Sequence, residues 1–242
     1  MAVLIDQELC TGCKMCSDVC PVDAISGDAG KPHSIDENKC VLCGQCVQMC
    51  SSFASVFDEE IEPIEKKLSD RKMLKGIKEP LFAAYYDNNI HKVVDILNDK
   101  NQFSVVQCAP AVRVAIAEDF GMDLGSLTPG KMAAALRKLG FDRVYDTNFS
   151  ADLTIMEEGT ELIERVTKNE KLPMFTSCCP AWVKYMEQSH PEYLDHLSTC
   201  KSPQQMAGAI FKTYGAKLDN KSAKDIASVS IMPCTCKSFE SE

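Results

Sequence analysis

The chain has 242 residues, of which 45% are hydrophobic and 25% are charged, and its formal net charge is −9. This length allows one large domain or a small and a medium one, and the composition is typical of a globular protein. The acidic balance argues against nucleic acid as a partner, and the apolar runs are too short to span a membrane. The N-terminus lacks the basic and apolar regions of a secretory signal, so we expect a cytoplasmic protein.

Eight of the fourteen cysteines form one pattern that occurs twice within the first fifty residues. Each copy has the spacing C-x2-C-x2-C-x3-C, which is the ligand spacing of two [4Fe-4S] cubanes, and the fourth cysteine of each copy reaches the neighbouring cluster. By this rule, one cluster is held by Cys10, Cys13, Cys16 and Cys50, and the other by Cys20, Cys40, Cys43 and Cys46.

Two alternatives explain this pattern less well. Zinc sites have no need of the third and fourth cysteines at this spacing, and disulfide scaffolds are short and secreted. Clustered thiols are easily oxidised, so we expect a reducing, anaerobic compartment. Ile5-Asp6 and Ile35-Asp36 precede the two copies and predict a short strand in each half. Residues 1–58 therefore resemble a two-cluster bacterial ferredoxin of α+β fold.

Residues 59–102 are rich in charge and in helix formers, and we interpret them as a helical linker. Its last part is an amphipathic helix through Ile90, Val93, Val94 and Leu97.

From residue 103 onward, strand-like and helix-like segments alternate, which predicts an α/β domain with a mainly parallel sheet flanked by helices. Thr128 and Pro129 begin one helix, Gly140 ends it, and Ser150 is expected to cap the longest helix. We predict strands at 103–110, 143–147, 172–177 and 226–232, and helices at 112–120, 129–139, 150–168, 181–188 and 203–212.

Three of the predicted strands end in a turn of cysteine and proline. Ligands gather at the carboxyl ends of parallel strands, so we expect these turns to converge on one site. We interpret Cys108 and Cys200 as small buried hydrophobic residues. Cys179 and Cys234 each lie next to a proline turn at a strand end, and metal ligation explains them better.

The segments Thr176–Trp182 (TSCCPAW) and Met232–Glu240 (MPCTCKSFE) resemble the first two signature motifs of the [FeFe]-hydrogenases. The resemblance covers essentially the whole chain, with residues 103–242 as the first lobe of the catalytic domain. It implies reversible reduction of protons to H2, with electrons relayed through the two N-terminal clusters. The implied active site is the H-cluster, a cubane joined to a diiron unit that carries carbonyl, cyanide and a bridging dithiolate.

The same resemblance assigns roles to single residues. Cys179 and Cys234 would be two ligands of the active-site cubane, and Cys178 would pass protons to the dithiolate. Lys237 would donate a hydrogen bond to a cyanide. The residues that would line the diiron pocket are Ala109, Pro110, Ser202, Gln204 and Met232.

A proton route from Cys178 to the surface is also implied. Glu158, Glu161 and Arg165 share one helical face, which by itself indicates a solvated surface with a Glu161–Arg165 salt bridge. The resemblance instead implies a relay, in which carboxylates accept and pass protons. The relay residues would be Glu158, Glu161, Arg165, Ser198 and Glu240.

The family's third motif, with two further cluster cysteines, does not occur in these 242 residues. We therefore expect a fragment of a longer protein or, as the second choice, a partner that supplies the other lobe. We find no role for Cys236 beyond that of a structural thiol. The expected partner is an electron-transfer protein or an iron–sulfur subunit of a larger complex, either formate-linked or nicotinamide-linked.

Two alternative functions belong to other classes. The first is a non-catalytic hydrogenase-like iron–sulfur protein for cluster assembly or H2 sensing. Cys178 argues against it, because such a protein has no use for a proton-donating thiol beside the ligand Cys179. The second is a plain ferredoxin with a binding domain, which does not explain the two cysteine motifs.

Overall fold

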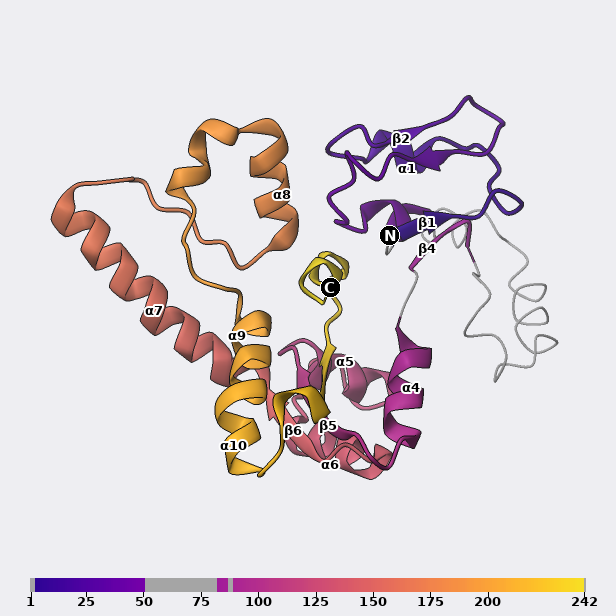
Figure 1. Ribbon diagram of the computed structural model, residues 1–242. Coiled ribbons are helices and arrows are strands. Elements are labelled where there is room, and N and C mark those ends of the chain that lie inside the picture. The colour runs from indigo at the N-terminus through magenta and orange to yellow at the C-terminus, as the bar shows by residue number, and fades with distance from the viewer. Residues whose placement is uncertain (1–2, 51–81, 87–88, 242) are drawn as a thin grey trace. The chain divides into compact units, whose positions relative to one another are not determined.

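The computed structural model describes residues 3–50, 82–86 and 89–241 (Figure 1). The chain divides into two compact units, Met1–Asn88 and Asn89–Glu242. The part of the predicted helical linker before residue 82 lies outside the described residues. The predicted fold class is confirmed, since a ferredoxin-like region precedes an α/β unit with a parallel sheet and flanking helices.

Two short antiparallel ribbons organise the first unit. β1 (Val3–Ile5) pairs with β4 (Ala84–Tyr86), and β2 (Ile25–Ser26) pairs with β3 (Ser34–Ile35). β1 and β3 are the strands expected before the two cysteine copies. We expected helix throughout residues 59–102, and this is wrong at Ala84–Tyr86, which form the strand β4. The backbone N–H and C=O groups of β1 need partners, and residues 84–86 supply them.

The two cysteine copies turn their loops in the same way. Gly12 and Leu42 occupy equivalent positions and have φ of 71° and 53°, while Lys14 and Gly44 have φ of 69° and 77°. Successive N–H groups in such left-handed turns form concave sites for anions. A Cβ atom at Gly12 would lie 2.3 Å from the backbone N of Lys31, so only glycine fits there. The short helix α1 (Met15–Asp18) follows the first loop, and residues 45–50 are helical after the second.

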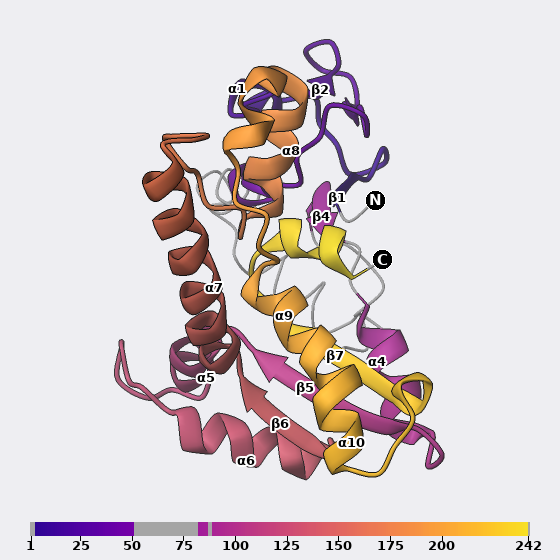
Figure 2. The same ribbon diagram turned by 60° about the vertical axis from the view of Figure 1, so that its left-hand side comes forward.

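The second unit is built on a parallel sheet with the strand order β6-β5-β7 (Figure 2). The central strand is buried from Ser104 to Cys108, as expected where both faces of a sheet are covered. The strands are β5 (Phe103–Cys108), β6 (Arg143–Asp146) and β7 (Ile226–Ile231).

Neighbouring side chains of β5 enter two separate cores, because successive residues of a strand face opposite sides. Val106 belongs to a cluster with Met132 and Leu136 of α6 (Pro129–Leu139). Val105 belongs to a cluster with Phe211, which follows α9 (Pro203–Ile210). Full burial of a valine side chain, such as that of Val105 or Val106, stabilises a fold by about 1.5–3 kcal/mol.

The predicted helices of the second unit are present, with small shifts at their ends. Gly140 ends α6 with φ of 112°, as expected, but the Thr128 hydroxyl does not cap this helix. It donates to the backbone O of Arg113 at 2.8 Å instead. The other helices are α4 (Ile90–Asn98), α5 (Val112–Asp119), α8 (Pro180–Ser189), and α9 with its continuation in η3 (Phe211–Gly215) and α10 (Ala216–Leu218).

The longest helix, α7 (Thr147–Lys168), begins three residues before the predicted cap Ser150. Asp146 caps it, because its Oδ1 accepts from the backbone N of Asn148 at 2.9 Å. Ser150 lies inside the helix, where its hydroxyl donates to the backbone O of Thr147 at 2.9 Å. The prediction of Ser150 as the cap is therefore wrong, and the preceding acidic residue takes that role.

The predicted strand at 172–177 is also wrong. This segment makes only an isolated parallel bridge between Phe175 and Leu197, so the sheet has three described strands instead of four. Its apolar residues have strand propensity, but Pro173 removes a backbone donor. Two 3-10 helices complete the site region, η2 (Pro191–His196) and η5 (Thr235–Glu240).

Candidate functional site

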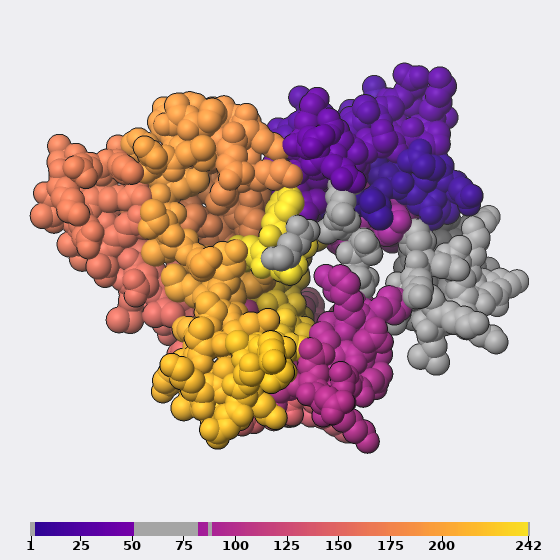
Figure 3. Space-filling model, viewed as in Figure 1, coloured from indigo at the N-terminus to yellow at the C-terminus, as the bar shows by residue number. Residues whose placement is uncertain are grey.

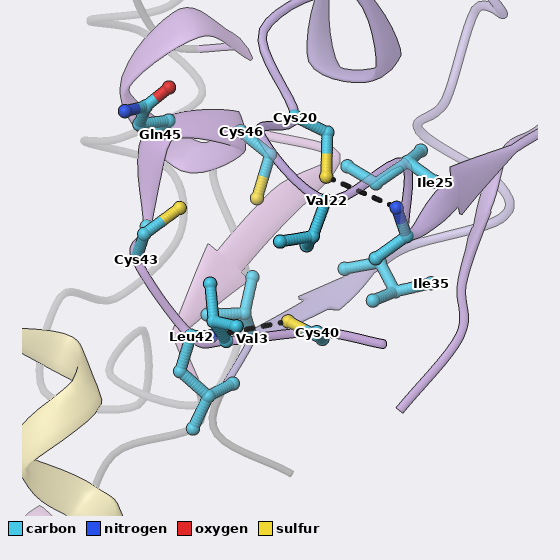
Figure 4. A pocket seen from close by; sticks show the side chains of 13 residues that line it. Val3, Cys20, Val22, Ile25, Ile35, Cys40, Leu42, Cys43, Gln45 and Cys46 are labelled. Atoms are coloured by element: carbon cyan, nitrogen blue, oxygen red, sulfur yellow. Dashed lines mark hydrogen bonds between the residues drawn. The ribbon is translucent and has the colours of Figure 1, made fainter. Parts of the chain in front are cut away.

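Four cysteines of the first unit line one pocket, and Figure 4 shows their sulfurs directed into it. The set combines the last cysteine of the first copy with the first three of the second. The rest of the wall is mostly apolar and includes Val3, Val22, Ile25, Ile35 and Leu42. The four cysteines are Cys20, Cys40, Cys43 and Cys46.

Backbone N–H groups reach the sulfurs in both copies. In the first copy, Ala24 N donates to Cys20 Sγ at 3.2 Å and His33 N donates to Cys10 Sγ at 3.4 Å. In the second copy, Leu42 N donates to Cys40 Sγ at 3.4 Å. Such bonds favour the thiolate form and tune bound iron–sulfur clusters.

Burial and the neighbouring thiols Cys10 and Cys13 raise the pKa of Cys16 to about 11. Burial and the thiols Cys40 and Cys43 raise the pKa of Cys46 to about 12. Crowded thiols in an apolar wall stay protonated unless a positive partner is present.

This donor set fits an iron–sulfur cluster. Grouped thiols, backbone N–H donors and apolar walls are the features that such clusters use. Across residues 3–50, 82–86 and 89–241, no three His, Cys, Asp or Glu side chains are grouped as the ligands of a single metal ion.

In the second unit, one side chain joins the two cysteine-proline motifs. The Nζ of Lys237, on η5, donates to the backbone O of Cys178, just before α8. The Lys184 ammonium of α8 lies 4.5 Å from the centre of the Phe239 ring of η5. The two segments therefore lie side by side, as Figures 1 and 2 also show. Cys178, Cys179 and Cys234 are exposed on this surface, and Cys236 is buried.

Lys237 is held by a carboxylate on its own helix. Its Nζ lies 3.1 Å from Glu240 Oε1, and the Ser202 hydroxyl donates to Glu240 Oε2 at 2.6 Å. Ser202 is also the N-cap of α9, so this network anchors η5 to α9. Gln204 Nε2 donates to the backbone O of Lys237 at 3.1 Å. The Gln204 Oε1 is buried and has no hydrogen-bond partner among the described residues.

A second network surrounds Glu161 on α7. Arg165 Nη2 donates to Glu161 Oε1 at 2.6 Å, and the Ser198 hydroxyl donates to Glu161 Oε2 at 2.7 Å. Burial acts to raise the pKa of Glu161, but the hydrogen bonds from Ser198, Arg165 and Thr199 outweigh it and lower the pKa. The salt bridge expected from the sequence is confirmed, but Arg165 is buried, so this face is not a solvated one.

The other predicted relay residues have different positions. Glu158 Oε1 is buried and has no hydrogen-bond partner among the described residues. Glu240 takes no part in the hydrogen bonds described for Glu161 and instead pairs with Lys237. The structure therefore joins Glu161, Arg165 and Ser198 directly and places Glu240 in a separate network.

The two cysteines interpreted as buried hydrophobic residues differ. Cys108 is fully buried in the core, as predicted. Cys200 is half-buried, and its thiol donates to Glu161 Oε2 at 3.9 Å, while its backbone N donates to the Ser198 hydroxyl oxygen at 3.1 Å. Sequence reasoning missed this contact, for which the only signal is that Cys200 is two positions after Ser198.

The remaining pocket residues predicted by resemblance lie at the carboxyl ends of neighbouring strands. Ala109 follows β5, and its N donates to the backbone O of Ile231, the last residue of β7, at 3.0 Å. Met232 follows directly. Ala109 and Met232 are half-buried, and Pro110 is exposed.

The long helix α7 buries polar groups and exposes apolar ones. Thr147, Ser150, Thr154 and Arg165 are its buried residues. In the space-filling view, the α7 segment lies along an edge of the second unit (Figure 3). The exposed large apolar side chains of α7 are Phe149, Ile155, Met156, Leu162, Ile163 and Val166. This pattern is the reverse of that of an ordinary surface helix, which buries its apolar stripe and exposes its polar one.

The fold and these networks define a two-part iron–sulfur protein, and comparison with known proteins identifies its family. Residues 102–242 match the family model described as iron only hydrogenase large subunit, C-terminal domain. Residues 3–26 and 33–52 match a 4Fe-4S binding domain. The chain therefore belongs to the [FeFe]-hydrogenase family and has an N-terminal iron–sulfur domain, which confirms the resemblance.

The chain is 45% identical over 242 residues to the periplasmic [Fe] hydrogenase large subunit of Nitratidesulfovibrio vulgaris, covering 98% of this chain and 51% of that protein. It is 38% identical over 258 residues to the NADP-reducing hydrogenase subunit HndD of Solidesulfovibrio fructosivorans, covering 99% and 39%. It is also 31% identical over 208 residues to the cytosolic Fe-S cluster assembly factor narfl of Xenopus tropicalis, covering 84% and 39%. The chain spans about half the length, or less, of these relatives.

Among solved structures, apo [FeFe]-hydrogenase from Chlamydomonas reinhardtii matches with a TM-score of 0.59 and 48% identity. The match covers 62% of this chain and 39% of that one. Within the described ranges, none of the helices combines the length and the apolar character needed to cross a bilayer. One relative is named as periplasmic, so the cytoplasmic compartment stays a prediction.

Proposed function

We propose that the chain provides the electron input and the proton relay of a hydrogenase that reversibly reduces protons to H2. The observation that carries this proposal is the buried polar stripe of α7, where Glu161 accepts hydrogen bonds from Arg165 and Ser198. A helix that buries polar side chains, holds two carboxylates half-buried and exposes apolar side chains fits a proton-transfer task better than a purely structural one. The family membership supports the same reaction.

Electrons would enter through the first unit. Two [4Fe-4S] clusters would be held by the two crossed sets of four cysteines, and the shared pocket of the second set supports this assignment. The electron donor would be an electron-transfer protein or an iron–sulfur subunit of a larger complex. A relative named as an NADP-reducing hydrogenase subunit favours the nicotinamide-linked alternative over the formate-linked one.

Cys179 and Cys234 would ligate the active-site cubane of an H-cluster, which when bound supplies the iron chemistry of H2 formation. Both thiols are exposed on the surface where the two motifs meet. Ala109, Pro110, Met232, Ser202 and Gln204 would line the diiron pocket. Lys237 would direct a positive charge at a cyanide, and Glu240 keeps this ammonium in place.

Protons would move along side chains of the second unit. The thiol of Cys178 would exchange a proton with Glu158, whose buried Oε1 lacks a partner within the described part of the chain. Ser198 and Glu161 would carry the proton outward. Arg165 stays charged in proteins, so it holds Glu161 in position and does not carry the proton itself.

A second candidate function is cluster assembly without catalysis, which the likeness to the narfl assembly factor favours. The two candidates differ in their need for Cys178. A ligand set for assembly requires Cys179 but not a proton donor beside it, whereas proton reduction requires both.

The test is the substitution Cys178→Ser in the matured holoenzyme. We expect H2 evolution to fall by about 10²-fold or more while the iron content stays the same, because a general acid contributes rate and not cluster binding. Cys200→Ser is the matched control, since this thiol lies near the relay without ligating iron. Near-normal H2 evolution by Cys178→Ser would contradict the proposal.

A further inference from the structure

Cys236 has no role in the proposed function, yet it lies close to Cys234, a proposed cubane ligand. The residue is 2% exposed, whereas Cys234, two positions earlier, is exposed. The two Sγ atoms lie 3.1 Å apart. An exposed thiol with a second thiol in reach is the arrangement of cysteines that oxidise reversibly.

The local backbone explains why the two sulfurs meet. Cys234 is extended, with φ of −80° and ψ of 111°, and the 3-10 helix η5 begins at the next residue. Lys237 then holds η5 against the start of α8 through the backbone O of Cys178. The buried sulfur is thus kept beside the exposed one, which gives it a high effective concentration for reaction.

We propose that Cys234 and Cys236 are a site of reversible oxidation by peroxide. Hydrogen peroxide first oxidises the exposed Cys234: an S–O bond forms, the O–O bond breaks, and water leaves. The sulfur of Cys236 then attacks the Cys234 sulfur, so that an S–S bond forms, the S–O bond breaks, and hydroxide leaves with the thiol proton as water. Two thiols and one peroxide yield one disulfide and two waters, with two electrons passing to the peroxide.

The disulfide would be easily reduced. Residues two positions apart close a very small ring, so the bond is strained, and strained or exposed disulfides are the labile ones. The exposed sulfur is thereby kept in a form that thiol reductants restore. Without Cys236, oxidation of Cys234 would continue to sulfinic and sulfonic acids, which are not restored.

Oxidation and cluster binding exclude each other at Cys234. The metal ligand is the thiolate, and a sulfur within a disulfide cannot serve as one. This consequence rests on the proposed role of Cys234 as a cubane ligand, whereas the oxidation itself does not.

The oxidation is tested on the full chain without iron, treated with one equivalent of hydrogen peroxide, alkylated and digested for mass spectrometry. We expect the peptide that contains both cysteines to be lighter by two hydrogens and not alkylated, and dithiothreitol to reverse the change. In Cys236→Ser and Cys236→Ala, irreversibly oxidised Cys234 should increase by roughly tenfold, because the neighbouring thiol no longer captures the first product. Cys200→Ser is the control that keeps the pair. Equal irreversible oxidation of Cys234 with and without Cys236 would overturn the proposal.

A second arm separates this proposal from the proposed function. The matured holoenzyme is treated with peroxide in parallel with the iron-free chain. Slower formation of the Cys234–Cys236 disulfide supports the ligand role of Cys234. An unchanged rate, with the disulfide still formed, overturns that ligand role and leaves the oxidation site in place.

Discussion

Two carboxylates of the second unit are each held by the same two kinds of group, a cation on the same helix and a serine hydroxyl. In both, the hydroxyl donates to the carboxylate at close distance, 2.7 Å in one and 2.6 Å in the other. The first network is Glu161, Arg165 and Ser198, and the second is Glu240, Lys237 and Ser202.

The two networks differ in the acceptors that the remaining N–H groups of the cation bind. Arg165 donates to backbone carbonyls, among them Leu197 O at 2.7 Å and His196 O at 3.1 Å, so it fixes the loop that carries Ser198. Lys237 donates to the backbone O of Cys178, at the first cysteine-proline motif. The same chemistry thus positions a carboxylate in one network and a positive charge in the other.

The largest expected stability effect comes from the cation of the first network. Arg165→Met leaves Glu161 without its cation and leaves several backbone carbonyls without their donor, so the free energy of unfolding should fall by about 3–5 kcal/mol. Urea denaturation followed by circular dichroism measures it. Lys237→Met is the matched variant and should cost less, because Lys237 contacts fewer backbone carbonyls. Equal losses would show that the two networks do not differ as described.

The two serines separate proton transfer from helix capping. Ser198→Ala removes a donor to Glu161, and the rate of H2 evolution by the holoenzyme should fall by about 10²-fold if this hydroxyl passes protons. Ser202→Ala removes the N-cap of α9, so we expect a loss of about 1 kcal/mol in unfolding free energy. The rate of H2 evolution and the free energy of unfolding are measured in both variants. The distinction between the networks fails if Ser202→Ala lowers turnover more than Ser198→Ala does.

The smallest effect is a pH dependence of stability. The folded-state pKa of Glu161 is lowered, so its contribution is present above the unfolded value of about 4.3 and is lost as the pH falls through the folded value. The difference in unfolding free energy between the wild type and Glu161→Gln should therefore narrow on acidification from about pH 6 to pH 3. A difference that stays constant over this range would show that Glu161 gains nothing from its donors.

Features that depend on neighbouring residues could be predicted from the sequence. The apolar run of β5, the proline at the start of α6 and the doubled cysteine spacing each specify structure from a few neighbouring residues. The sequence did not predict contacts between distant residues, such as Ser202 with Glu240 or the pairing of β1 with β4. The strand expected at 172–177 failed because Pro173 and a single bridge do not sustain a ladder.

In the proposed function, the Glu161 network moves protons, whereas the Glu240 network fixes a charge. The most direct measurement is the ratio of H2 evolution rates in H2O and D2O for the holoenzyme variants Glu161→Gln and Glu240→Gln. We predict that Glu161→Gln lowers turnover by about 10²–10⁴-fold and raises the isotope ratio, because proton transfer becomes rate-limiting, while Glu240→Gln leaves the ratio at the wild-type value. An unchanged isotope ratio in Glu161→Gln, or the same rise in both variants, would contradict the claim.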